Sequence, residues 1–333
     1  MSATPEAAPP AAPKSVGWAT RIAKAPWRLI GIVLLVVVLL NIDLNRLLQQ
    51  FERLGPGPIV MAAGAFVLLL VGRYWRWRVL TLAVGAKQQL WSLIVSCNRS
   101  IWLGLVTPGR VGEFRRAADL SVVRGWGLAA SSSLVLIDLL IDLGAYTAIG
   151  LGGFLYLSLA APWGPILAGA VLVGAVSMLF ALGGIAGQAA RLFPILLRVP
   201  GFAELLPALG GGLPGGRALQ VVMATTVAAI AYITMIWCLV HPMQPDLDVG
   251  QIGASVGLAG VAGAIPITYF GLGTRDIMLV SFFAHLGRPA EQAVAVSFSI
   301  LLAQVIGIFV SLAAEPVLGV AAKRNDRREK PGG

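Results

Sequence analysis

The chain has 333 residues, of which 57% are hydrophobic and 12% charged, and its mean hydropathy is +0.84. Because about a quarter of the residues in soluble domains are charged, this composition excludes an ordinary soluble enzyme and a disordered polyelectrolyte, and it indicates a protein that crosses a membrane several times. The net charge of +10 fits cytoplasmic loops, which collect Lys and Arg, so we expect no nucleic-acid partner. Two cysteines and two histidines leave little room for a disulfide framework or a metal centre, and we expect neither a metal nor a cofactor.

The first apolar element follows a tail rich in Ala and Pro (residues 1–25), which we expect to be disordered and cytoplasmic. A helix is predicted from about Trp27 to Leu44, and it is retained because no small-residue cleavage site follows the apolar run. The second span begins at Pro58 after a Gly-Pro turn and ends in Arg73-Tyr-Trp-Arg-Trp-Arg78. We interpret that ending as an interfacial anchor, with aromatic rings at the lipid headgroups; a cation–aromatic ligand cage is the alternative.

Four later stretches are long enough to cross a hydrocarbon core, which needs about 20 residues. They are Leu128 to Ala160, Ile166 to Gly187, Ala218 to Val240 and Ala293 to Val320. Between the second and third of these, residues 188–217 suit an amphipathic interfacial helix. Residues 321–333 form a short basic tail.

Two other apolar regions are each interrupted by a Pro/Gly segment that carries opposite charges. The first runs from Leu90 to Asp119 and is broken at Thr107-Pro-Gly-Arg-Val-Gly-Glu113. The second runs from Ile252 to His285 and is broken between Pro266 and Asp276. Both patterns predict re-entrant hairpins or interrupted helices, which membranes tolerate where the freed backbone faces protein or water.

The distribution of positive charge tests this arrangement. With the N-terminus inside and each broken region returning to its own side, only four of the 25 Lys and Arg residues lie outside, as the positive-inside rule requires: Arg46, Arg53, Arg275 and Arg288. We therefore predict an all-α polytopic membrane protein with one transmembrane domain over residues 26–320. It has about six full spans plus two re-entrant or broken hairpins, inverted halves at about 26–160 and 161–320, and both termini in the cytoplasm. An eight-span arrangement, with both broken regions crossing fully, stays open.

The two breaks are candidate sites for an anion, because a new helix start points free N–H groups at the break and nearby arginines reinforce that preference. An inverted pair of broken segments also places a substrate site near the bilayer midplane. The alternative is a tight turn whose charged residues simply pair. The predicted substrate-binding residues are Arg110, Glu113, Arg115, Arg116, Arg275 and Asp276, and the predicted backbone notch consists of Pro108, Gly109, Gly112, Gly271 and Gly273.

Two further patterns have competing interpretations. Asp138 and Asp142 are four residues apart and share one helix face. They either neutralise a neighbouring arginine inside the bundle, or they act as a proton or cation relay or as a glycosidase-like pair of carboxylates. Gly253-Ala-Ser-Val-Gly257 matches the Gly-x-Ser-x-Gly pattern of a nucleophile elbow. It lies in an apolar helical stretch, however, where small residues that ease helix packing explain it better.

The motif Thr107-Pro-Gly-Arg-Val-Gly-Glu-Phe-Arg-Arg116 after Asn98, followed late in the chain by Gly271-Leu-Gly-Thr-Arg-Asp276, resembles the transmembrane region of lysylphosphatidylglycerol synthases. Stand-alone members are flippase-like membrane proteins, some associated with hopanoid lipid pathways. The resemblance covers roughly residues 25–320, and Asp276 stands where the family is expected to have a glutamate. It implies a multi-pass protein of the bacterial cytoplasmic (inner) membrane that moves or presents a lipid. The soluble aminoacyl-transferase domain of full-length synthases is not expected here, so lysyl transfer by this chain is not expected either.

Three function classes follow from these observations. The leading interpretation is a flippase-like transporter of an anionic phospholipid or isoprenoid-type lipid, whose headgroup phosphate lies between the two broken regions. The sequence has no P-loop, so ATP hydrolysis by this chain is not expected. The alternatives are a membrane-embedded transferase of hopanoid or lipid-linked sugar synthesis and a non-catalytic partner of a lipid-biosynthesis enzyme, although no catalytic motif stands in a credible structural context.

Overall fold

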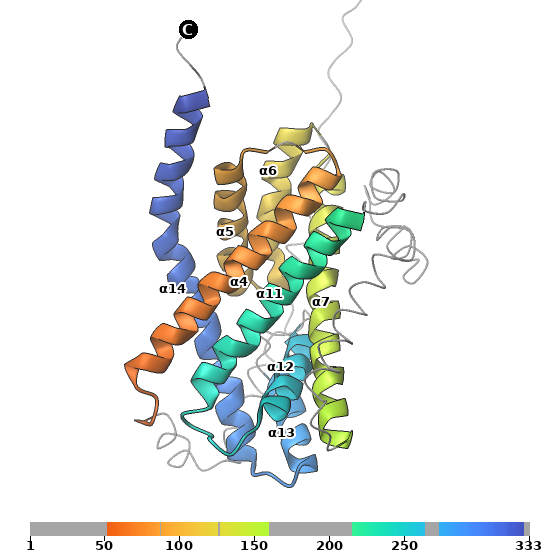
Figure 1. Cartoon of the computed structure of the whole chain (residues 1–333), viewed down its shortest axis with the longest axis vertical. Coiled ribbons are helices and arrows are strands. Elements are labelled where there is room, and N and C mark those ends of the chain that lie inside the picture. Colours follow the sequence, from red (N-terminus) through yellow and green to blue (C-terminus); the bar gives the residue numbers. More distant parts are fainter. Residues whose placement is uncertain (1–51, 87, 126, 160–214, 264–272, 330–333) are drawn as a thin grey trace, which may run out of the picture.

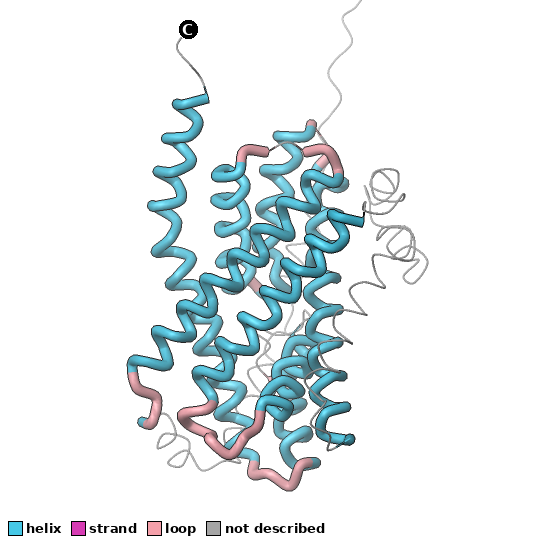
Figure 2. The backbone as a smooth tube through the Cα atoms, in the orientation of Figure 1, coloured by secondary structure: helices cyan, strands magenta, loops and turns pink. Residues whose placement is uncertain are grey.

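The computed structural model describes residues 52–86, 88–125, 127–159, 215–263 and 273–329, and within them every regular element is a helix (Figure 2). This confirms the all-α class. Among these described residues, four helices are long and apolar enough to cross a membrane: α4 (Pro56–Ala83), α7 (Leu128–Leu159), α11 (Gly215–Val240) and α14 (Ala290–Glu329). The predicted spans at Trp27–Leu44 and Ile166–Gly187, the N-terminal tail and nearly all of segment 188–217 lie outside the described residues.

Helix α4 corrects one prediction from the sequence. The helix begins after Gly55 with Pro56 in its first turn, where a proline fits because the N–H that it lacks has no helical partner. It does not end at the arginine- and aromatic-rich segment but continues to Ala83, and Arg73 and Arg76 are only 5% and 1% exposed. The interpretation of this segment as an interfacial anchor is therefore wrong for these two arginines, because carboxylates from other helices meet them inside the bundle.

The first broken region folds back on itself. It consists of α5 (Leu90–Val106), the 3-10 helix η1 (Pro108–Phe114) and α6 (Arg115–Arg124). Figure 1 shows α5 and α6 beside each other, with their outer ends at the end of the molecule where the C-terminus lies. At 1.5 Å per residue, the 17 residues of α5 measure about 26 Å, which is less than a hydrocarbon core of about 30 Å. Helix α5 is therefore too short to cross such a core by itself, and η1 follows it with Glu113 fully buried.

The second broken region approaches from the opposite end. Helices α12 (Val249–Gly263) and α13 (Thr274–His285) lie at the far end from the C-terminus (Figure 1), and residues 264–272 between them are outside the described part. The two hairpins thus point toward each other from opposite ends. An inverted repeat of the whole halves stays a prediction, because both halves include residues that the structure does not describe.

Glycines set the close approach of α7 and α12. A Cβ atom on Gly257 would lie 2.2 Å from Gly150 Cα, and one on Gly153 would lie 2.7 Å from Ala254 Cα. Ser255 is fully buried and donates to the Gln251 carbonyl at 2.7 Å. The small residues therefore serve helix packing, as preferred from the sequence, and the serine is not at a nucleophile elbow.

The loops at the second hairpin's outer end are tied together by Asp246 and Arg288. Arg288 Nη1 donates to Asp246 Oδ2 at 2.5 Å, and Gln292 Nε2 donates to the same oxygen at 3.2 Å. Slight burial raises the pKa of Asp246, but hydrogen bonds from its own backbone and from these two side chains outweigh it, so the pKa is below its ordinary value.

The stabilisation from Asp246 is expected to be present above the ordinary Asp pKa of about 3.9 and to be lost as the pH falls through the lower folded-state value. We therefore expect Asp246→Asn to lower the melting temperature in detergent at pH 7, and the difference from the native chain to shrink below about pH 4. Melting curves of both proteins across this range test it. An equal difference at pH 7 and pH 3 would contradict the assignment.

Gly112 at the first hairpin tip lies against the backbone of α5. A Cβ atom there would lie 2.3 Å from the Leu103 carbonyl, so Gly112→Ala is expected to cost about 1 to 3 kcal/mol of stability through overpacking. Gly64 in α4 is the matched control, since nothing lies within 4 Å of its Cβ position and alanine favours a helix. Thermal unfolding in detergent should show a loss for Gly112→Ala and none for Gly64→Ala.

Candidate functional site

A cavity of about 380 Å³ lies between the tips of the two hairpins. The first tip contributes Thr107 and Arg110, and the second contributes Gly263 and Arg275. Long helices complete the walls, mainly with apolar side chains such as Phe66, Leu69, Leu140, Met235 and Ile300. The charged part of the lining is mostly cationic and consists of Arg73, Arg76, Arg110 and Arg275 with Asp142. The uncharged polar residues are Thr107, Tyr146, Thr225, Tyr232 and Gln304.

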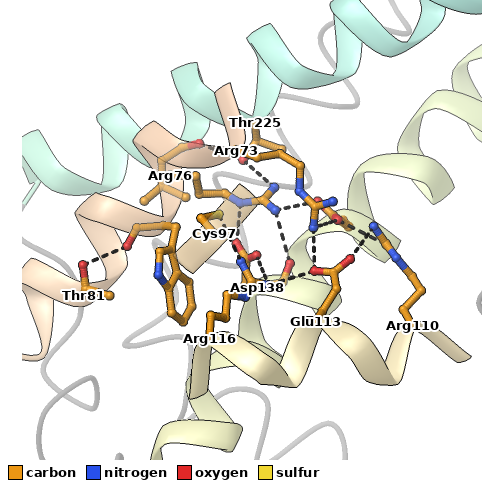
Figure 3. A network of polar contacts seen from close by, with 12 residues as sticks. Arg73, Arg76, Thr81, Cys97, Arg110, Glu113, Arg116, Asp138 and Thr225 are labelled. Atoms are coloured by element: carbon orange, nitrogen blue, oxygen red, sulfur yellow. Dashed lines mark hydrogen bonds and ion pairs between the residues drawn. The ribbon is translucent and has the colours of Figure 1, made fainter. Parts of the chain in front are cut away.

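One side of this cavity is a network of buried ion pairs, shown in Figure 3. Arg76 is its centre: Nε donates to Asp138 Oδ1 at 2.6 Å and Nη2 to Asp142 Oδ1 at 2.6 Å. The other oxygen of Asp142, Oδ2, forms ion pairs with Arg73 Nη2 at 3.1 Å and with Arg110 Nη1 at 3.3 Å. We call the whole set the ion-pair ladder; its members are Arg73, Arg76, Arg110, Glu113, Arg116, Asp138 and Asp142.

Glu113 joins three arginines of the ladder. It lies 2.8 Å from Arg73, 2.7 Å from Arg110 and 2.9 Å from Arg116, and it is fully buried. Arg116 reaches Asp138 at 2.8 Å with the same guanidinium, which lies over the Trp77 ring at 4.3 Å from its centroid. A cation above an indole face gains a further electrostatic attraction, so Arg116 is held from three sides.

Helical spacing explains why these side chains converge. Arg73 and Arg76 are three apart on α4, and Asp138 and Asp142 are four apart on α7, so each pair shares one face of its helix. The short η1–α6 junction places Glu113 and Arg116 opposite both pairs. The sequence interpretation in which Asp138 and Asp142 neutralise a neighbouring arginine therefore matches their contacts, while a role in proton coupling receives no support from them.

The second hairpin tip presents Arg275, which is 2% exposed. Its Nε donates to Ser297 Oγ of α14 at 2.9 Å, and its Nη2 lies 3.8 Å from Asp276 Oδ1. Asp276 accepts from the Gly273 N–H at 2.6 Å and from the Ser297 hydroxyl. Gly273 has φ +89°, a conformation that favours glycine, so Asp276 closes the start of α13 and thereby orients Arg275.

Arg115 and Gly112, which were also predicted from the sequence, do not line the cavity. Arg115 is 47% exposed in its side chain and pairs with Asp119 at 2.9 Å on α6. Pro108 and Gly109 belong to the first turn of η1, and Gly112 approaches its own hairpin backbone rather than open space. Gly271 lies outside the described residues.

Sequence reasoning missed Arg73 and Arg76 because arginine interleaved with Trp and Tyr is typical of a membrane interface. A usable signal was present: two arginines three apart in an apolar helix match two aspartates four apart in another. Tyr146 and Tyr232 were also missed. Their rings lie 5.5 Å apart at the cavity wall, and nothing in the local sequence distinguishes them from ordinary aromatic residues.

The arrangement can bind an anion. Each ladder carboxylate already contacts two or three guanidinium groups, so none is a free general base or acid. No group of three His, Cys, Asp or Glu side chains within the described ranges could hold a metal ion. The cavity's four arginines are therefore its chemically distinctive feature.

Arg76→Ala should destabilise the protein by about 3 to 5 kcal/mol, because it leaves two buried carboxylates without their central partner. Arg78→Ala is the matched control: it lies on the same helix but is exposed, and a change there should stay within about 0.5 kcal/mol. Thermal unfolding in detergent measures both. Similar melting temperatures for the two variants would contradict the burial of the ladder.

Comparison with known proteins agrees with the motifs and the all-helical fold. The family model described as "Lysylphosphatidylglycerol synthase TM region" matches residues 28–313. No curated protein and no solved structure matches the chain. The family match spans both hairpins and every member of the ion-pair ladder. The chain therefore belongs to the family of lysylphosphatidylglycerol synthase transmembrane regions.

Proposed function

We propose that the chain moves an anionic lipid across the bilayer and that the lipid headgroup binds in the cavity between η1 and α13. The observation that carries this proposal is the cavity's lining: among the described residues it includes four arginines, from α4, η1 and α13, and one carboxylate, that of Asp142. Membership of a lipid-related membrane family makes a lipid phosphate the natural anion.

Electrostatics favour an anion at this place. Arginine forms two parallel hydrogen bonds with phosphate and is more weakly hydrated than lysine, so it suits a site from which water is partly excluded. Opposite charges attract more strongly in a medium of low dielectric constant than in water. A phosphate in the cavity would therefore be held by Arg110 and Arg275, one from each hairpin tip.

The hairpins also suit movement between two leaflets. The two short hairpins approach each other from opposite ends, and the cavity lies between them. In transporters with inverted repeats, a site between two such broken segments lies near the bilayer midplane. The apolar walls beside the arginines would accommodate the first part of a lipid tail, while a cavity of about 380 Å³ takes a headgroup rather than a whole lipid. Transport would then proceed through opening at one tip and then at the other.

We place the C-terminal end of the molecule in the cytoplasm of a bacterial inner membrane. The outer ends of α5 and α6 and the end of α14 lie together there (Figure 1), and the neighbouring sequence is rich in Lys and Arg, including Arg124, Lys323 and Arg324. Positive segments resist translocation. With this orientation the Asp246–Arg288 loops face the periplasm.

A transferase mechanism has less support. It would need a carboxylate free to act as acid or base, and Glu113, Asp138 and Asp142 are all engaged by arginines. A lipid-biosynthesis enzyme as a partner of this chain stays a prediction.

Lipid movement in proteoliposomes tests the function. We expect the purified chain to expose tail-labelled phosphatidylglycerol to an external quencher faster than protein-free liposomes do, and Arg275→Ala to slow this by about tenfold or more, equivalent to about 1.4 kcal/mol. The exposed Arg78→Ala serves as the control and should keep the native rate. Native transport by folded Arg275→Ala, or no transport by the folded native chain, would overturn the proposal.

A further inference from the structure

We propose that Arg110 is the exchangeable ligand of the cavity: on binding, its guanidinium leaves Glu113 and Asp142 for the headgroup phosphate, and the site accepts one negative charge. This inference rests on the proposed function and narrows its substrate class. A phosphodiester headgroup carries one negative charge, so the site should prefer it over a phosphomonoester.

Charge balance is the first argument. In the part of the chain that the structure describes, the buried and half-buried charged groups of the ladder and the second hairpin tip are five guanidinium groups and four carboxylates, namely Arg73, Arg76, Arg110, Arg116 and Arg275 with Glu113, Asp138, Asp142 and Asp276. One positive charge is in excess. An uncompensated charge is costly in a medium of low dielectric constant, so a single anion completes the balance.

Arg110 carries this excess charge. Without it, the ladder consists of three arginines and three carboxylates. Glu113 would retain Arg73 and Arg116 at 2.8 and 2.9 Å. Asp142 would retain Arg73 and Arg76 at 3.1 and 2.6 Å. Departure of Arg110 therefore leaves neither carboxylate without a counter-ion.

Arg110 is also the most accessible member of the ladder. Its side chain is 28% exposed and lines the cavity, whereas those of Arg73, Arg76 and Arg116 are 6%, 1% and 0% exposed. In Figure 3 Arg110 lies at one end of the network, beside Glu113. A ligand in the cavity can contact Arg110 without disrupting the rest.

The backbone supports a specific role for this side chain. Arg110 has φ +57° and is the only non-glycine residue with a positive φ in the described ranges. For an L-residue this conformation costs about 1 to 2 kcal/mol, and such outliers gather at ligand-binding positions. A glycine would adopt this backbone conformation without the cost. The presence of an arginine at this position is therefore explained by the groups that its guanidinium binds.

The charge limit predicts how headgroups are ranked. At neutral pH a phosphomonoester carries between one and two negative charges because its second pKa is about 6, so it exceeds what one spare cation balances. Arg110 contacts Glu113 and Asp142 directly, and the other titratable groups among the described lining residues are Arg73, Arg76, Tyr146, Tyr232 and Arg275. None is a histidine, the side chain that ordinarily titrates between pH 5 and 8, so phosphate protonation dominates the change in that range.

Two short-chain lipids with identical tails test the ranking. We expect purified protein in detergent to bind dihexanoyl phosphatidylglycerol, a diester, about tenfold or more tightly than dihexanoyl phosphatidic acid, a monoester, at pH 8, which corresponds to about 1.4 kcal/mol. At pH 5, where the monoester carries a single charge, the two affinities should converge. Equal or tighter binding of phosphatidic acid at pH 8 would overturn the inference.

Arg110→Gly identifies the residue responsible. Glycine keeps the positive φ and leaves a balanced ladder, so the melting temperature should stay at or above that of the native chain. Its affinity for phosphatidylglycerol should fall about tenfold or more, and its preference over phosphatidic acid should disappear. Arg99→Ala on α5, exposed by 44% and paired with Glu315, is the control and should behave as the native chain does.

The outcomes separate the two proposals. Native transport together with unchanged binding by Arg110→Gly would reject the role of Arg110 and leave the lipid transporter intact. Absence of both anionic-lipid binding and transport in the folded native chain would reject the transporter itself, and this inference with it.

Discussion

The structure depends on ion pairs between buried charged side chains, because an unpaired charge is unfavourable in an apolar interior. A charged side chain near a bilayer centre costs about 2.5 to 3.5 kcal/mol on insertion scales, and the ladder joins seven charged side chains in one network. Each is accommodated because it has at least two oppositely charged neighbours. The pairs connect α4, α7 and the η1–α6 junction, so they fix the first hairpin against two long helices and keep its tip inside the molecule.

The arginines near the cavity differ in their surroundings. Arg76 and Arg116 are enclosed by carboxylates and by Trp77, and they act as structural counter-ions. Arg110 and Arg275 lie at the hairpin tips and line the cavity. Both arginines stand near the start of a short helical element beside a break in the helix, and this places them at the cavity.

The composition and the positions of Pro, Gly and charge predicted the membrane class, the helical fold, the two interrupted regions and the family. They also pointed to Arg110, Glu113, Arg116 and Arg275, because charge beside a helix break is rare in an apolar segment and therefore informative. The prediction that Arg115 lies in the binding site was misplaced. Arg115 is exposed, whereas the next residue, Arg116, is buried. At a helix start a shift of one residue turns a side chain by about 100°, and sequence spacing alone did not fix which face met α4.

The sequence by itself determined that these segments enter a membrane, since hydropathy is a local property that each segment carries on its own. Only the tertiary structure decided which arginine meets which carboxylate. The contact of Arg76 with Asp138 joins residues that are 62 apart in the chain. Arg110 and Arg275, which line the same cavity, have a much larger separation in sequence. Such pairings follow from how the helices pack, because an ion pair in a low-dielectric interior depends on distances of a few ångströms that no local pattern encodes.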